Sequence, residues 1–168
     1  MERIIYWTED VWIVSAERVR DYFLNQGMEE RIITCSDSIA TVALAACALG
    51  CEQGRIAKTL ASDAGDKVIL VVAAGDVRVD NRKFKEQFAI KPRMLARDET
   101  ETRTGHPAGG VCPFAVSAGA SVYLDVSLQR FATVFPACGS SSSAIELSLP
   151  ELQQHARSAG WVDVCKPG

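Results

Sequence analysis

The sequence predicts one mixed α/β domain built around a single curled sheet. Segments with strand-like apolar patterns alternate with segments of helical periodicity along the whole chain. The run over residues 68–74 has no polar interruption, which is typical of a buried central strand. No linker of biased composition divides the 168 residues, so residues 1–168 are taken as one domain with a core over about 15–164.

Capping residues and breakers place the expected helices, and apolar alternation places the strands. The helices run from Ser15 to Gly27, from Ser38 or Thr41 to Gly50, from Asp80 or Asn81 through Phe88, over 98–103, and from Pro150 to Gly160. The strands cover 31–35, 55–61, 67–74, 93–96, 121–126, 130–137, 144–149 and 161–164. We therefore expect roughly seven strands and four or five helices.

The overall charge does not indicate a general nucleic-acid binder, because the formal net charge is −3. The charge is unevenly spread, however. Residues 78–103 contain eight basic and five acidic side chains, a local charge of +3. Such a patch can contact a phosphate backbone, although a mixed run of this kind is also typical of an ordinary solvated surface.

Composition argues against a membrane protein and against a structural metal site. No stretch approaches the ~20 apolar residues of a membrane span, and acidic residues stand where a signal peptide would be apolar. We therefore expect a cytoplasmic protein. Six cysteines include no Cys-x-x-Cys pair, and the two histidines lie far apart, so neither a metal ion nor another cofactor is expected.

The most distinctive segment is a glycine-rich and proline-rich loop over residues 103–114. Glycines allow sharp bends and close approach to a ligand, while Pro107 and Pro113 stiffen the two ends. A rigid loop with available backbone N–H groups can hold a phosphate or a developing oxyanion. A tight structural turn is an equally good interpretation of the segment alone.

Two charged residues interrupt apolar strands. Lys58 follows Ile56 and Ala57, a position where a lysine is rare unless it reaches a partner or a ligand such as a phosphate. Asp125 interrupts the apolar segment 122–126 and could orient a base, bind an amine or pair with Lys58. An exposed lysine and a structural aspartate are the alternatives.

Cys112 lies in the glycine-rich loop and could act as a thiol nucleophile. That chemistry needs a neighbouring base that forms the thiolate, and His106 is the nearest candidate in sequence. A serine hydrolase and a P-loop are not indicated, because neither Gly-x-Ser-x-Gly nor a Gly-Lys-Ser/Thr phosphate-binding turn occurs.

Several blocks occur in a characteristic order from about Ser15 to Val164. They are Thr41-Val-Ala-Leu-Ala-Ala46, Ile56-Ala-Lys-Thr-Leu60, the run over 68–80, Thr104-Gly105, Gly109-Gly-Val-Cys-Pro-Phe114, and Val122-Tyr-Leu-Asp125. The ordered set resembles the YbaK/EbsC-type family of aminoacyl-tRNA editing domains, which includes the prolyl-tRNA-synthetase-associated deacylases.

The resemblance implies a curved, barrel-like sheet with a pocket for the 3′ end of a charged tRNA. Family members hydrolyse the ester that joins a wrong amino acid to tRNA, without a covalent enzyme intermediate. The resemblance therefore implies tRNA as a partner and an aminoacyl-tRNA synthetase as a candidate partner, with no membrane or DNA. It assigns catalysis to Lys58, Gly109, Gly110 and Asp125, and substrate binding to Thr41, Thr104, Gly105, His106, Cys112 and Pro113.

Two positions depart from the family pattern. Cys112 stands where members usually have a small hydroxyl residue, and Ala43 replaces an acidic residue of the Ala-rich helix. Both changes leave the amino acid that is edited open. The leading hypothesis is a deacylase that acts in trans on tRNA mischarged with a small amino acid. The alternatives are a non-catalytic module that binds the acceptor end and a Cys112-dependent thiol hydrolase.

Overall fold

The computed structural model describes residues 9–168 and the side chains from Ser15 onward, and it confirms the mixed α/β prediction. Within that range, five α-helices span α1 Glu9–Asn25, α2 Val42–Leu49, α3 Asn81–Phe88, α4 Thr100–Thr104 and α5 Leu149–His155. The strands are β1 Ile32–Thr34, β2 Ile56–Asp63, β3 Val68–Ala74, β4 Val77–Val79, β5 Ala120–Asp125, β6 Thr133–Pro136, β7 Ser143–Ile145, β8 Leu147–Ser148, β9 Trp161–Val162 and β10 Cys165–Pro167. Short 3-10 helices cover Glu29–Arg31, Gln53–Arg55 and Val126–Arg130.

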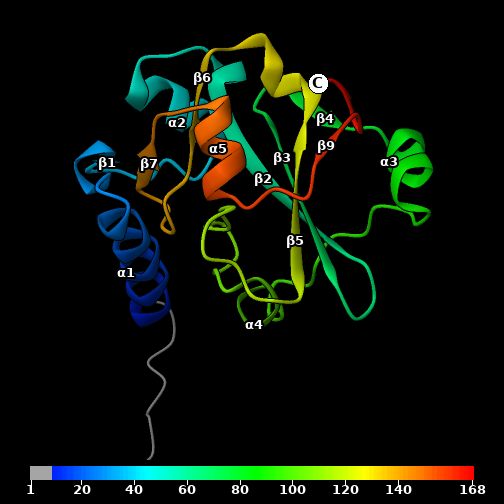
Figure 1. Cartoon of the computed structure of the whole chain (residues 1–168), viewed down its shortest axis with the longest axis horizontal. Coiled ribbons are helices and arrows are strands. Elements are labelled where there is room, and N and C mark those ends of the chain that lie inside the picture. Colours follow the sequence, from blue (N-terminus) through cyan, green and yellow to red (C-terminus); the bar gives the residue numbers. More distant parts are fainter. Residues whose placement is uncertain (1–8) are drawn as a thin grey trace, which may run out of the picture.

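The central sheet has six strands in the order β8-β6-β2-β3-β5-β9 and is curled (Figure 1). Strands β2 and β3 form an antiparallel pair, whereas β2 runs parallel to β6 and β3 runs parallel to β5. Two further pairs, β1 with β7 and β4 with β10, lie outside this sheet. The prediction of roughly seven strands around one curled sheet is therefore close to the observed architecture.

Strand β3 divides the core because its side chains alternate between the two faces of the sheet. Leu70 and Val72 belong to the larger cluster, which includes Val19 and Phe23 of α1. Val71 and Ala73 point to a second cluster that contains Phe84 of α3. Helices α1 and α3 accordingly flank the sheet on opposite sides (Figure 1). Both faces of β3 are covered, which explains its uninterrupted apolar sequence.

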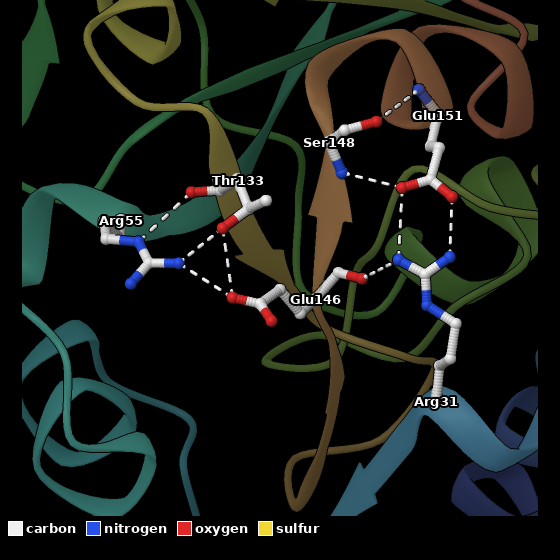
Figure 2. A network of polar contacts seen from close by, with 6 residues as sticks. All are labelled: Arg31, Arg55, Thr133, Glu146, Ser148 and Glu151. Carbon is white, nitrogen blue, oxygen red and sulfur yellow. Dashed lines mark hydrogen bonds and ion pairs between the residues drawn. The ribbon is translucent and has the colours of Figure 1, made fainter.

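A polar network joins the start of β1 to the β6–β8 region (Figure 2). Arg31 donates from two nitrogens to the Glu151 carboxylate, at 2.6 and 3.1 Å, and to the Glu146 carbonyl at 2.8 Å. The Glu146 carboxylate accepts from Arg55 at 2.8 Å and from Thr133 at 3.0 Å. The hydrogen bond from Arg31 lowers the pKa of Glu151 to about 2. These contacts hold in place the strands that carry one wall of the cavity described below.

Three local predictions are wrong. Helix α1 begins at Glu9, so Ser15 lies inside the helix rather than at its N-cap. The expected strand over 93–96 reduces to one bridge between Met94 and Ser62. Strand β2 continues through Asp63, where a turn was expected, because it keeps its antiparallel pairing with β3 to that point. Among the described residues, no helix is long and apolar enough to cross a membrane.

Candidate functional site

A cavity of about 640 Å³ opens between α2, β2 and three loop segments, over residues 92–97, 108–111 and 137–141. This volume falls in the range of small-ligand sites, which spans roughly 300–1,000 Å³. Of the predicted site residues, the cavity brings together Thr41, Lys58 and Gly109. Lys58 and the glycine-rich turn therefore face the same space.

Lys58 lies in β2 opposite Ala73 of β3 and is half-buried. Its ammonium donates to the carbonyl of Val77 and, at 3.4 Å, to that of Gly75. Burial lowers the pKa of Lys58 below its ordinary value. The carbonyls of the turn after β3 and of the first residue of β4 thus orient the ammonium, and an ammonium has a third donor for a ligand.

Gly109 occupies the third position of a tight turn. The turn is closed by the Gly110 N–H, which donates to the Pro107 carbonyl at 2.9 Å. Gly109 has φ of 86°, the left-handed value that a type II turn requires at this position and that glycine adopts without strain. The Gly110 N–H already donates within the turn and is not available to a ligand. The N–H groups of Ala108, Gly109 and Val111, which all line the cavity, donate to no other described group. They are therefore available as donors to a ligand.

The ionisable side chains that line the cavity are all positively charged. They are Lys58, Arg93 and Arg97, and no Asp or Glu lines the cavity within residues 9–168. Arg93 and Arg97 are exposed, and neither side chain forms a hydrogen bond or ion pair with another described residue. A concave site lined by cations concentrates anions, so the electrostatics favour a phosphate-bearing ligand.

The remaining lining is mostly apolar and small. It includes Ile39, Val42, Ala45, Leu49, Ile56, Phe135 and Val111, together with hydroxyl residues such as Thr41, Thr59, Ser140 and Ser141. Thr41 is the N-cap of α2, and its hydroxyl accepts from the Leu44 N–H at 3.2 Å. Met94 lies at the rim with 90% of its surface exposed. The cavity therefore combines an apolar wall with a cationic rim.

The family model of the aminoacyl-tRNA editing domain matches residues 36–155, more than half of the chain. The chain belongs to this family. The predicted resemblance to the editing domains is thereby confirmed. The matched range includes β2 with Lys58 and the loop with Gly109.

Relatives extend the match over nearly the whole chain. The uncharacterized protein YwhH of Bacillus subtilis (strain 168) is 49% identical over 154 residues, which cover 91% of this chain and 98% of that protein. A crystal structure described as that of a proposed trans-editing enzyme for prolyl tRNA synthetase is 25% identical, with a TM-score of 0.81. It covers 90% of this chain and 97% of its own. The hypothetical protein APE2540 is 29% identical, with a TM-score of 0.77 and coverage of 89% and 99%.

His106 and Thr104 of this editing domain are buried away from the cavity. His106 is fully buried, and its Nε2–H donates to the Phe114 carbonyl at 2.7 Å. Its Nδ1 accordingly accepts from the Ser15 hydroxyl at 2.5 Å. Burial lowers the pKa of His106 to about 4, so the ring is neutral at physiological pH. The Thr104 hydroxyl donates to the Thr100 carbonyl at 2.7 Å and closes the last turn of α4.

Cys112 does not have the environment of a nucleophile. It is fully buried and does not line the cavity, and burial raises the pKa of its thiol to about 12. Its sulfur lies 3.4 Å from Nε2 of His106, but the hydrogen of that nitrogen is directed to the Phe114 carbonyl. Neither a thiolate nor a base is present, so the geometry argues against the thiol-hydrolase alternative.

Asp125 serves the backbone rather than the cavity. One of its oxygens accepts from the Ser127 N–H at 2.9 Å and caps the 3-10 helix over 126–130. The other oxygen accepts from the Val164 N–H, also at 2.9 Å. Asp125 does not line the cavity and forms no ion pair with Lys58 among the described residues. Of the options that the sequence left open for Asp125, the structure favours the structural aspartate over a pair with Lys58.

Gly105 and Pro113 also lie outside the cavity. Gly105 ends α4 with φ of 88°, and its carbonyl accepts a hydrogen bond from Arg18. Pro113 lines a second cavity of about 400 Å³, beside Tyr22 and His155. Within the described part of the chain, no three His, Cys, Asp or Glu side chains are arranged to hold a metal ion.

Sequence reasoning missed two features of the site. Arg93 and Arg97 were visible only as members of a mixed charge run, and nothing in their order marked them as cavity residues. The contacts of Ser15 and Arg18 with the glycine-rich loop join segments about ninety residues apart, which no local pattern shows.

Proposed function

We propose that this protein is an aminoacyl-tRNA deacylase that hydrolyses, in trans, the ester of tRNA mischarged with a small amino acid. One observation carries the proposal. In a chain of the editing-domain family, Lys58 and Gly109 line one cavity whose ionisable side chains are all cationic. The relative described as a proposed trans-editing enzyme for prolyl tRNA synthetase makes tRNA for proline the first substrate to examine.

The proposed chemistry uses the ester's own reactivity. An aminoacyl ester is already activated, so a positioned water suffices as nucleophile. Its attack on the carbonyl carbon releases the free amino acid, and the ribose oxygen leaves with a proton as the hydroxyl of the tRNA. The Gly109 N–H donates to the carbonyl oxygen as it becomes an oxyanion, and one such donor contributes roughly 3–4 kcal/mol in well-studied hydrolases. Lys58 stabilises the same developing charge or holds the terminal phosphate. Gly110 acts indirectly, since its N–H holds the turn.

The cationic rim suits the tRNA backbone. Arg93 and Arg97 have no carboxylate partner among the described residues, so their charges are available to the phosphates that precede the terminal adenosine. In this proposal the enzyme meets its substrate in the cytoplasm, either alone or beside a synthetase.

The apolar wall suits a small side chain. Val42, Ala45 and Leu49 of α2 face the cavity together with Phe135. An apolar pocket separates amino acids that differ by one methylene by only about 1–3 kcal/mol. Preference among small amino acids is therefore expected to be graded rather than absolute.

The proposal is tested with purified protein and a panel of tRNAs esterified with Ala, Cys, Ser and Pro at fixed ionic strength. Multiple-turnover ester loss with at least one small amino acid is the expected result. Tight, salt-sensitive tRNA binding without ester loss would instead identify the non-catalytic binding module. Absence of both binding and hydrolysis with every tRNA would reject the proposed substrate class.

A further inference from the structure

Helix α1 contacts the catalytic loop although it lies outside the range that the family model matches. That range begins at residue 36, whereas α1 ends at Asn25. The side chains of Ser15, Arg18 and Phe23 on this helix all reach the segment 105–115. The loop that contains Gly109 is therefore held by an element that precedes the matched domain.

Ser15 and His106 form a directed chain of hydrogen bonds. A backbone carbonyl only accepts, so the bond between Nε2 of His106 and the Phe114 carbonyl fixes the proton on Nε2. Nδ1 of the neutral ring is then an acceptor, and the Ser15 hydroxyl must donate to it at 2.5 Å. The chain runs from α1 through His106 to Phe114, on the far side of Gly109 in sequence.

Arg18 holds both ends of the same loop. Its guanidinium donates to the carbonyl of Gly105, just before His106, and to that of Ala115 at 3.3 Å. The Nη2 that donates to Gly105 also lies 3.5 Å from Nδ1 of His106. Because one planar group bridges residues 105 and 115, the ends of the loop are held at a set separation.

Helix α1 also packs against the 105–115 loop and against a second loop, at Gly139, that leads to the cavity wall. The rings of Phe23 and Phe114 meet edge to face with centroids 4.9 Å apart. Gly139 presses so closely on α1 that an added Cβ would lie 2.7 Å from the Ser15 carbonyl oxygen. The neighbouring Ser140 lines the cavity. Helix α1 therefore contacts both loops that close this side of the site.

We propose that α1 is a positioning element of the active site, in which Ser15, Arg18 and His106 hold the Gly109 turn at the geometry that the ester requires. This inference rests on the proposed function. None of the three residues lines the cavity, so they act through the loop and not on the substrate. An oxyanion donor stabilises the transition state only when it is held in place before the reaction. We call the contacts of Ser15, Arg18 and His106 that hold the loop the brace.

Three variants isolate the Ser15–His106 link. Ser15→Ala removes the donor, and His106→Phe keeps a ring of similar size while removing the acceptor at Nδ1 together with the N–H that serves the Phe114 carbonyl. The double variant removes both. Each is expected to lower kcat roughly 10- to 100-fold, with KM for the tRNA nearly unchanged, since misplacement by about 1 Å has effects of this size. The double variant should be no slower than the slower single variant, because all three break one link.

Arg20→Ala is the matched control on the same helix. Arg20 is exposed and pairs with Glu29 at 2.8 Å, so its replacement should leave kcat at the wild-type value. Thermal unfolding of every variant establishes that the assays are run on folded protein. A combined loss equal to the product of the two single losses would overturn the link, and so would wild-type kcat in both folded single variants.

Amide hydrogen exchange separates this inference from the proposed function. Peptides that cover residues 105–115 should exchange faster in Ser15→Ala and His106→Phe than in the wild type or in Arg20→Ala. That result with a wild type that hydrolyses no ester would keep the brace and reject the deacylase. Unchanged exchange in this segment, with an active wild type, would reject the brace and keep the deacylase.

Discussion

Lys58 and Gly109 line the same cavity, although one lies within a central strand and the other in a turn after α4. The ammonium of Lys58 is oriented by two carbonyls, and the conformation of Gly109 is set by the turn that the Gly110 N–H closes. Two groups suited to negative charge are thus held by the backbone on the walls of one space. This relationship is the structural basis of the proposed deacylase.

Acid should destabilise the protein through His106. The ring titrates at about 4 in the fold and near 6.5 when unfolded, so the unfolded state binds the proton first as the pH falls. The neutral ring contributes its full share to the free energy of unfolding above pH 6.5, and this share is lost progressively as the pH falls toward 4. Between pH 7.5 and 5 the free energy of unfolding should drop by about 2 kcal/mol more in the wild type than in His106→Gln. Urea unfolding of both proteins at the two pH values measures the difference, and equal drops would contradict it.

Asp125→Asn should lower stability and leave catalysis intact. The substitution replaces one of two acceptors that serve backbone N–H groups, so the free energy of unfolding should fall by about 2 kcal/mol. Asp163→Asn is the control, since Asp163 is exposed and pairs with Lys83, and it should cost under about 1 kcal/mol. At a temperature where both variants are folded, kcat of Asp125→Asn should match the wild type. A large loss of kcat at unchanged stability would return Asp125 to the catalytic site.

Cys112→Ala should remain active. The thiol is buried and protonated, so its removal creates a small cavity that costs roughly 1–2 kcal/mol and affects no step of the reaction. Thiol alkylation of the native protein should modify the exposed Cys47 and spare Cys112. Loss of activity in folded Cys112→Ala, together with rapid alkylation of Cys112, would restore the thiol-hydrolase alternative.

Arg93→Ala and Arg97→Ala should weaken tRNA binding without slowing the bound substrate. Each change removes one phosphate contact, so KM should rise, and the slope of log affinity against log salt should decrease in magnitude by about 1. Arg157→Ala, which lies at the second cavity, is the control for loss of a surface charge. Single-turnover rates at saturating enzyme should stay at the wild-type value in all three. An unchanged salt slope in the Arg93 and Arg97 variants would place the tRNA elsewhere.

Local patterns predicted the framework because they reflect local physics. Ser38 or Thr41 and Asp80 or Asn81 were proposed as helix caps, and in each pair one residue, Thr41 or Asp80, accepts from the first turn of its helix. The run over 68–74 was expected to be a buried strand, and it is covered on both faces. Lys58 was singled out as a lysine in an apolar strand, and it does line the cavity.

The same reasoning misassigned polar residues whose partners are distant in sequence. Asp125 has the pattern of Lys58, a charge within apolar residues, but Val164 at the end of the chain takes one of its oxygens. Ser15 was proposed as a helix cap because it precedes a segment of helical periodicity, but its hydroxyl donates to His106, 91 residues away. Whether such a group faces a ligand or the backbone depends on tertiary contacts, which spacing does not encode.

The rate of ester loss from mischarged tRNA, compared between the wild type and Lys58→Ala under single-turnover conditions, tests the central claim most directly. The account predicts that Lys58→Ala slows hydrolysis about 100-fold or more, as removal of one charge-stabilising group does in other hydrolases. Lys85→Ala, at an exposed position of α3, should match the wild type. A folded Lys58→Ala protein that hydrolyses the ester as fast as the wild type would contradict the account.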